Sequence, residues 1–136
     1  LIENLPDLDD IERVISWEDL SGSFAKRARA YLDANCAYCH SPKGSGNTSG
    51  LYLNLNNQDK MSSGICKKPV ASGNGSMGAS HDISPGNPED SILYLRMNSL
   101  DPSVMMPELG RSLIHKEAVE LIGKWIFDMD FSCSEL

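Results

Sequence analysis

Cys36-Ala37-Tyr38-Cys39-His40 is the stretch from which the rest of the chain can be interpreted. Two cysteines separated by two residues and followed by a histidine are the pattern that covalent attachment of a c-type haem requires. Because residues three apart lie on one side of a helical turn, Cys36 and Cys39 can reach two neighbouring positions on the porphyrin edge. His40 then projects over the macrocycle as an iron ligand. The motif therefore predicts a haem, and it requires a second ligand and an apolar pocket from elsewhere in the chain.

Three other kinds of site share parts of this motif. A dithiol redox centre also uses Cys-x-x-Cys, but it usually follows a strand in a βαβ unit, and no strand pattern precedes Cys36. A zinc site is disfavoured because adjacent Cys39 and His40 are poorly placed to share one tetrahedral metal. Its fourth ligand would have to be Cys66, His81 or His115. A disulfide between Cys36 and Cys39 would close a small, strained loop and leave His40 without a function.

The composition is that of one small acidic domain. The 136 residues suffice for one hydrophobic core, but a hydrophobic content of 40% is low, and a flat apolar porphyrin would make up the shortfall. The formal net charge of −7 argues against nucleic acid or an anionic membrane surface as a partner. It favours redox partner proteins with a basic docking patch. No segment is long and apolar enough to span a membrane.

Two cysteines remain outside the motif. Cys66 and Cys133 form an even remainder, which in an oxidising compartment predicts a disulfide, although two free thiols are the alternative. Such a bond would contribute roughly 4 kcal/mol in the chain-entropy model. The chain begins at Leu1 without Met and without a signal peptide. We therefore expect a mature or excised fragment of a protein exported to the periplasm or cell surface.

The chain divides into a short arm and a larger domain. Residues 1–22 show no sustained period, which predicts an extended arm or a linker from another domain of the same polypeptide. Trp17 and Leu20 are expected to anchor this arm to the body, and a short helix over Asp9–Ile15 is the alternative. Residues 23–136 form the predicted domain.

Three helices are expected in this domain, which makes it all-α. Phe24–Cys36 carries its apolar side chains on one helical face and delivers the first cysteine at its end. The second helix is predicted to start with Asn87 as its cap and Pro88 in its first turn, and to run to about Asn98. The last helix, about Lys116–Met129, is expected to cross the first and to close the cofactor pocket.

Long loops rich in glycine and serine connect these helices. Leu51, Leu53 and Leu55 alternate with polar residues, which predicts either a short strand or a coil that lays leucines on the haem edge. Leu53 is the residue that we assign to this contact. From Gln58 to Ser84 no period is visible, and we expect a surface excursion with a small hairpin around Cys66–Val70.

The loop of residues 103–110 is the predicted source of the second iron ligand. A thioether is a soft, neutral donor, and its pairing with histidine raises the reduction potential, which suits electron transfer. Met106, directly before Pro107, is the predicted ligand, and Met105 is the second choice. The alternative ligands are His81 and His115.

Two further residues are expected to support the cofactor. Arg96 could pair through its guanidinium with a haem propionate, with a solvated side chain as the alternative. A backbone carbonyl near Pro42 is well placed to accept the Nδ1 proton of His40 and to fix the orientation of the imidazole.

Over about residues 24–129 the chain resembles class I c-type cytochromes, and more narrowly the monohaem cytochrome c domains at the ends of larger exported bacterial proteins. The resemblance is carried by Cys36 to His40, Gly86-Asn87-Pro88-x-x-Ser91-x-Leu93-x-x-Arg96, Met106-Pro107-x-Leu109-Gly110 and Trp125-Ile126. It implies a cytochrome c-like fold of three main helices around one covalent haem c, with His40 and Met106 on the iron. The long Gly-Ser insertion and the extra cysteine pair depart from simple cytochromes.

The predicted function is the transfer of single electrons between redox partners. The iron cycles between two oxidation states, so no general base or substrate pocket is needed, and we expect a carrier instead of an enzyme. One alternative is an electron-relay module of a larger exported dehydrogenase. Others are a haem with a vacant sixth position that binds oxygen, nitric oxide or peroxide, and a zinc module.

Overall fold

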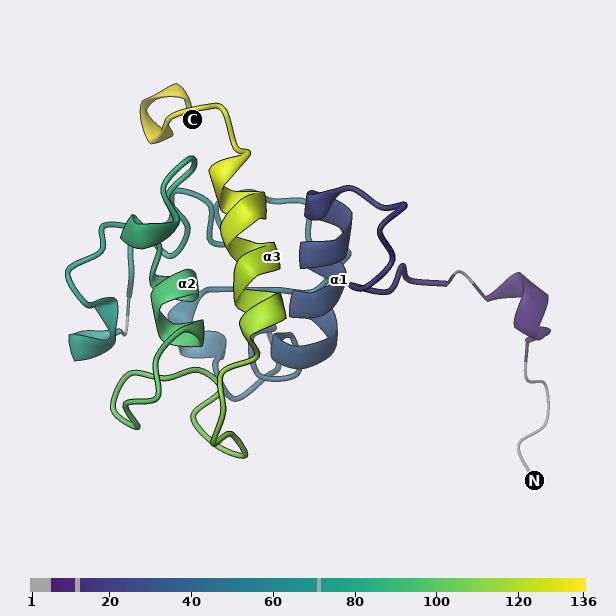
Figure 1. The fold of residues 1–136 in the computed structure, drawn as a ribbon, viewed down its shortest axis with the longest axis horizontal. Helices are drawn as coiled ribbons and strands as arrows, with labels where there is room; N and C mark the ends of the chain where they lie inside the picture. The colour runs from purple at the N-terminus through teal and green to yellow at the C-terminus, as the bar shows by residue number, and fades with distance from the viewer. Residues whose placement is uncertain (1–5, 12, 71) are drawn as a thin grey trace.

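Three α-helices form the body of the molecule. The structure, a computed structural model, describes residues 6–11, 13–70 and 72–136. Within these ranges the helices are α1 (Phe24–Cys36), α2 (Ile92–Met97) and α3 (Lys116–Phe127), joined by loops and short 3₁₀ turns without any β-strand. α3 lies between α1 and α2 and packs against both (Figure 1). The predicted all-α class is confirmed.

Helix α1 has the predicted bounds. Ser23 caps its start, since its side chain accepts a hydrogen bond from the backbone N–H of Lys26. Ala28 and Leu32 are fully buried on the face that meets α3, as the apolar period predicts. The helix ends at Cys36, whose carbonyl accepts hydrogen bonds from the N–H groups of Cys39 and His40. The motif is therefore wound onto a tight turn at the end of α1.

Helix α3 carries the largest part of the core. Its buried side chains are Ala118, Val119, Leu121, Ile122, Trp125 and Ile126. Ile122 and Ile126 are fully buried, and each stabilises the fold by roughly 1.5–3 kcal/mol. The helix ends at Phe127, two residues before the predicted end. It packs against α1.

Helix α2 is shorter than the sequence predicts. Asn87 makes no side-chain cap, and Pro88–Asp90 form a 3₁₀ turn instead of the first helical turn. Ser91 then adopts an extended conformation, because its buried hydroxyl donates to the Asn87 carbonyl (2.8 Å) and accepts from the N–H of Ser84 (2.9 Å). The hydrogen bond between Ser84 and Ser91 thus delays the helix start that Asn87 and Pro88 predict.

The loops between α1 and α2 pack as coil. Leu51 and Leu53 are buried without forming a strand, so the coil alternative is correct for them. The hairpin expected around Cys66–Val70 is wrong, since Ile65 instead forms an isolated parallel bridge with Ile83.

The C-terminal tail is tied to this loop region. The sulfur atoms of Cys66 and Cys133 lie 2.13 Å apart, a disulfide that confirms the predicted pair. The tail follows the end of α3 (Figure 1), and the bond ties it to the loop region between α1 and α2.

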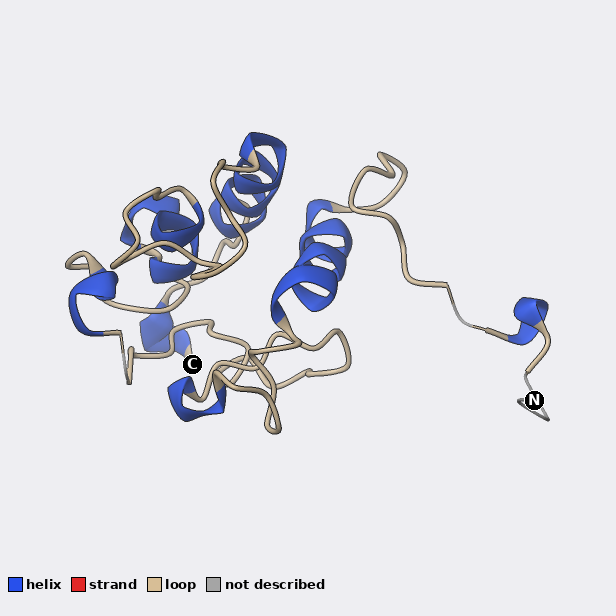
Figure 2. Cartoon of the chain, turned by 90° about the horizontal axis from the view of Figure 1, so that it is seen from below, coloured by secondary structure: helices blue, strands red, loops and turns tan. Residues whose placement is uncertain are grey.

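The N-terminal arm leaves the body on the side of α1 (Figures 1 and 2). Trp17 anchors it as predicted: the indole contacts Tyr31 and His115 edge-on, with ring centroids 6.0 and 4.9 Å away. Leu20 is 83% exposed, so its assignment as a second anchor is wrong. A 3₁₀ turn at Leu8–Asp10 is all that the described residues show of the alternative helix. Leu1–Leu5 and Glu12 lie outside the described residues.

No helix of the part described is long and apolar enough to span a bilayer.

Candidate cofactor-binding site

A cavity of about 760 Å³ opens beside the end of α1. Its wall takes side chains from all three helices and from the loops between them. The six residues that the sequence assigns to cofactor and metal binding all line it: Cys36, Cys39, His40, Leu53, Arg96 and Met106. The volume lies within the roughly 300–1,000 Å³ of sites that enclose small organic ligands. The fold thus brings residues from distant parts of the chain around one hollow.

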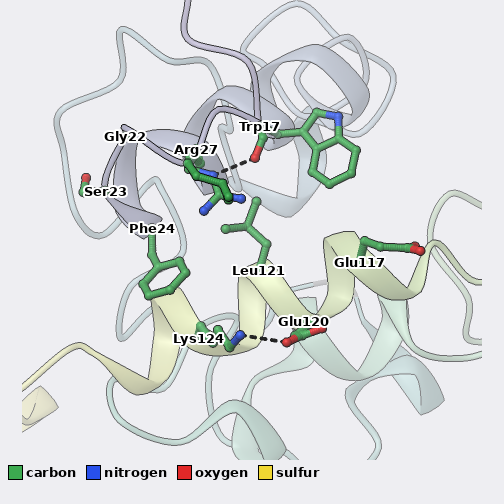
Figure 3. A pocket seen from close by; sticks show the side chains of 10 residues that line it. Trp17, Gly22, Ser23, Phe24, Arg27, Glu117, Glu120, Leu121 and Lys124 are labelled. Carbon is green, nitrogen blue, oxygen red and sulfur yellow. Dashed lines mark hydrogen bonds and ion pairs between the residues drawn. The ribbon is translucent and has the colours of Figure 1, made fainter.

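A second hollow, of about 550 Å³, lies between the start of α1, α3 and the arm (Figure 3). Its lining comprises Trp17, Leu20, Gly22, Ser23, Phe24, Arg27, Glu117, Glu120, Leu121 and Lys124. Three of the charged groups there already have partners: Lys124 pairs with Glu120 (2.7 Å), and Arg27 donates to the carbonyl of Trp17 (2.7 Å). None of the six assigned residues lines this hollow, so the larger cavity is the candidate site.

The two motif cysteines lie at the C-terminal end of α1 as free thiols. Cys36 is half-buried and Cys39 is exposed. Burial, with a smaller contribution from Cys39, raises the pKa of Cys36 to about 11. A dithiol exchange centre needs an easily formed thiolate, which helix N-termini stabilise. The position and the burial of Cys36 therefore disfavour such a centre.

The His40 imidazole is held at the cavity wall. Burial lowers the pKa of His40, and a hydrogen bond that the ring donates to the backbone of Leu51 opposes this shift only in part, so the neutral form that binds metals is favoured. Nδ1 lies 3.5 Å from Ser49 Oγ, and a Cβ on Gly46 would lie only 3.4 Å from the ring. The contact expected from Pro42 is thus wrong, because Ser49 and Leu51 supply the ring's polar neighbours. The His40 carbonyl accepts from the N–H of Leu53 (2.8 Å), which ties the motif to the buried leucines.

The lining of the cavity distinguishes between the candidate second ligands. Met106 lines it and Met105 does not. His115 also lines it, but its Nδ1 lies 3.0 Å from the Tyr31 hydroxyl and its Nε2 lies 3.9 Å from Glu117. Met97, another lining residue, is a buried member of the core, and His81 lies outside the lining. Met106 is the methionine of the predicted loop that lies at the site.

Sequence reasoning missed two polar lining residues of the site, Arg111 and Asp82, and the ion-pair partner of Asp82. Arg111 lines the cavity, and its guanidinium donates to the Met97 carbonyl (2.6 Å), while its Nε is buried without a partner. Lys67 and Asp82 form a buried ion pair of 3.0 Å, and Asp82 also lines the cavity. No local pattern marks any of them, because their partners are distant in the sequence.

The donors around the cavity fit the group that the motif predicts. Two thiols could form thioethers, an imidazole and a thioether could ligate iron, and buried leucines could cover a flat apolar ring. A zinc site fits less well. No three His, Cys, Asp or Glu side chains of the described residues gather as a metal site, and Cys66 is paired with Cys133.

Comparison with known proteins finds no family model, no curated protein and no solved structure that matches this chain.

Proposed function

We propose that this chain is a monohaem c-type cytochrome domain that carries single electrons between redox partner proteins. The observation that supports the proposal most is the shared lining of one cavity by Cys36, Cys39, His40 and Met106. Each belongs to a residue type that covalent attachment or axial ligation requires. Met106 is far from the other three in the sequence but lines the same cavity.

The residues of the site have distinct functions in this proposal. Cys36 and Cys39 hold the cofactor by thioether bonds, which fixes its position at the end of α1. His40 would bind through the nitrogen that does not face Ser49, and burial, which lowers its pKa, favours the neutral ring. Met106 supplies the second ligand. When bound, the haem iron would supply a one-electron couple, which a histidine–methionine pair shifts to a higher potential.

The surrounding apolar side chains would keep water away from a bound haem. Leu51, Leu53 and Ile92 are buried residues that also line the cavity. A low-dielectric, rigid wall reduces the reorganisation that accompanies a change of charge. Arg96, on α2, is the residue proposed to face the propionates.

The partners in this proposal are redox proteins that present a basic docking patch, because the chain carries a net charge of −7. The Cys66–Cys133 disulfide supports an oxidising, exported location such as the periplasm.

A second candidate function is an electron-relay module of a larger exported dehydrogenase. The observation that favours it is the arm, which leaves the helical body and contacts it mainly around Trp17 (Figure 1). In both candidates the site carries electrons and catalysis lies elsewhere.

The test of the proposal is an absorption spectrum of reduced protein after denaturation. The chain is produced in a host that attaches haem c, alongside Cys36→Ala/Cys39→Ala and the matched control Cys66→Ser/Cys133→Ser. We expect the haem bands to remain with the native chain and with the control through denaturation and extraction, and to be lost with the first variant. A colourless native protein would contradict the proposal, and loss of fold with a chelator would identify a zinc module.

A further inference from the structure

We propose that Arg111 is a positioning residue for Met106. Its guanidinium fastens the methionine loop, residues 98–111, to the end of α2, and it thereby determines how firmly the Met106 thioether competes for the iron. This inference rests on the proposed function.

The contacts of Arg111 close the loop onto its own start. Nη1 donates to the carbonyl of Met97 (2.6 Å), and Nη2 donates to the carbonyls of Ser99 and Arg96 (3.4 Å for Arg96). The last carbonyls of a helix have no partners within it, so they are available acceptors for a basic side chain. One planar guanidinium therefore joins the last residue of the loop to the residues from which the loop departs.

A second set of contacts connects this fastening to Met106 itself. The N–H of Met106 donates to the Arg96 carbonyl (3.0 Å), the same carbonyl that Arg111 Nη2 approaches. The Arg96 side chain donates through Nε to the carbonyl of Val104 (2.6 Å). Arg111, Arg96 and the backbone of Met106 thus form one connected group at the rim of the cavity.

Apolar packing does little to hold this loop. Val104 is its only buried residue, whereas Leu100 and Leu109 are 52% and 86% exposed. Hydrogen bonds from a charged donor are about twice as strong as neutral ones, so the arginine contacts are a strong restraint that holds the loop to the end of α2. Lysine keeps the charge but has no fork with which to reach several carbonyls at once.

The experiment measures how easily added imidazole displaces the thioether from the ferric protein. Variants Arg111→Gln and Arg111→Lys are compared with Arg27→Gln, a matched control. Arg27 donates to the carbonyl of Trp17 (2.7 Å) in the second hollow, away from the loop (Figure 3). We expect Arg111→Gln to raise the affinity for imidazole by roughly 10- to 100-fold, the factor for losing a charge-assisted hydrogen bond. Arg111→Lys should fall between Arg111→Gln and the native protein, and Arg27→Gln should leave the affinity unchanged.

A second readout and a double-variant comparison exclude a general loss of stability. The sulfur-to-iron charge-transfer band should weaken in Arg111→Gln and persist in Arg27→Gln. In a Met106→Ala background, where no thioether competes, Arg111→Gln should no longer change the imidazole affinity. If Arg111→Gln does not fold, as judged by circular dichroism, Arg111→Lys is tested in the same way.

The outcomes separate this inference from the proposed function. If Met106→Ala raises the imidazole affinity but the Arg111 variants match the native protein, Arg111 does not position Met106. The assignment of Met106 as the ligand then stands. If Met106→Ala changes neither the affinity nor the band, the ligand assignment itself fails. The control for Met106→Ala is Met105→Ala, because the Met105 side chain does not line the cavity.

Discussion

Lys67 and Asp82 form an ion pair inside the wall of the candidate site. The Nζ and Oδ2 atoms lie 3.0 Å apart, and each side chain is only 10% exposed. Burial raises the pKa of Asp82, and the hydrogen bond and charge of Lys67 oppose this shift only in part. Each charge is therefore costly to keep in the wall without the other.

We expect Asp82→Ala to destabilise the fold by about 3–5 kcal/mol, because it leaves a buried ammonium unpaired. The double variant Lys67→Met/Asp82→Leu should lose much less, since no unpaired charge remains. Glu120→Ala breaks the exposed pair with Lys124 and should leave the stability nearly unchanged, because solvent screens this pair. Urea unfolding measures all three. Equal losses for the single and double variants would show that the pair has no special importance.

At this scale the sequence predicts the residues whose chemistry has a fixed spacing. Cys36, Cys39 and His40 are recognisable because attachment and ligation need these types in this order. Arg111 is not recognisable, because its acceptors are backbone carbonyls, which every residue possesses. Asp82 and Lys67 meet only through the fold, so no local pattern predicts their pairing.

The turn that starts the methionine loop depends on one exposed carboxylate. Asp101 Oδ1 accepts hydrogen bonds from the N–H (2.9 Å) and the hydroxyl (2.8 Å) of Ser103, and these bonds lower the pKa of Asp101. The Asp101 carbonyl in turn accepts from the N–H groups of Val104 (2.9 Å) and Met105 (2.7 Å). The loop around Met106 is thus built on an ionised side chain.

Acid should loosen this turn. The folded-state pKa of Asp101 lies below its unfolded value, so its contribution is complete above about pH 4 and is lost as the pH falls through the folded-state pKa. We expect the protection of the Val104 and Met105 amides from hydrogen exchange, corrected for intrinsic rates, to fall as the pH is lowered below about 4. Asp101→Asn should show the lower protection already at neutral pH.

Asp59 supplies a control for this prediction. Its Oδ2 accepts from the N–H of Ser62 (2.7 Å) in a similar turn outside the methionine loop. Asp59→Asn should leave the exchange of Val104 and Met105 unchanged. If Asp101→Asn exchanges like the native chain at every pH, the carboxylate does not hold the turn.

Helices were predictable where one apolar face meets one partner. The bounds of α1 and the packing of α3 against α1 follow from their periodicity. The start of α2 does not, because the N–H groups of Ile92 and Leu93 bond to the carbonyls of His81 (3.1 Å) and Asp82 (3.0 Å). These long-range bonds override the local signals of Asn87-Pro88.

At the scale of the whole molecule, the Cys66–Cys133 disulfide links two distant parts of the chain. Cys66 and Cys133 are 67 residues apart in the chain, and a bond over this separation stabilises the fold by roughly 4 kcal/mol in the chain-entropy model. We expect Cys66→Ser/Cys133→Ser to lose about this amount in urea unfolding. Dithiothreitol should bring the native protein to the same value and leave the variant unaffected. A variant as stable as the oxidised native chain would contradict this expectation.

At the scale of the whole molecule, the helical class and the Cys66–Cys133 pair followed from the sequence. The position of the coil beside the cavity did not, because residues 58–84 lack a period and the coil is held by isolated bridges, buried leucines and the Cys66–Cys133 bond. Such a segment folds through contacts that are distant along the chain, which local propensities do not encode.

The two tryptophans of the chain lie in different environments. Trp125 is 7% exposed in the core of α3, whereas Trp17 anchors the arm beside Tyr31 and His115. Their fluorescence therefore distinguishes two events without any label. Single-tryptophan chains would report release of the arm through Trp17 and melting of the helical body through Trp125, so the arm's attachment becomes observable on its own.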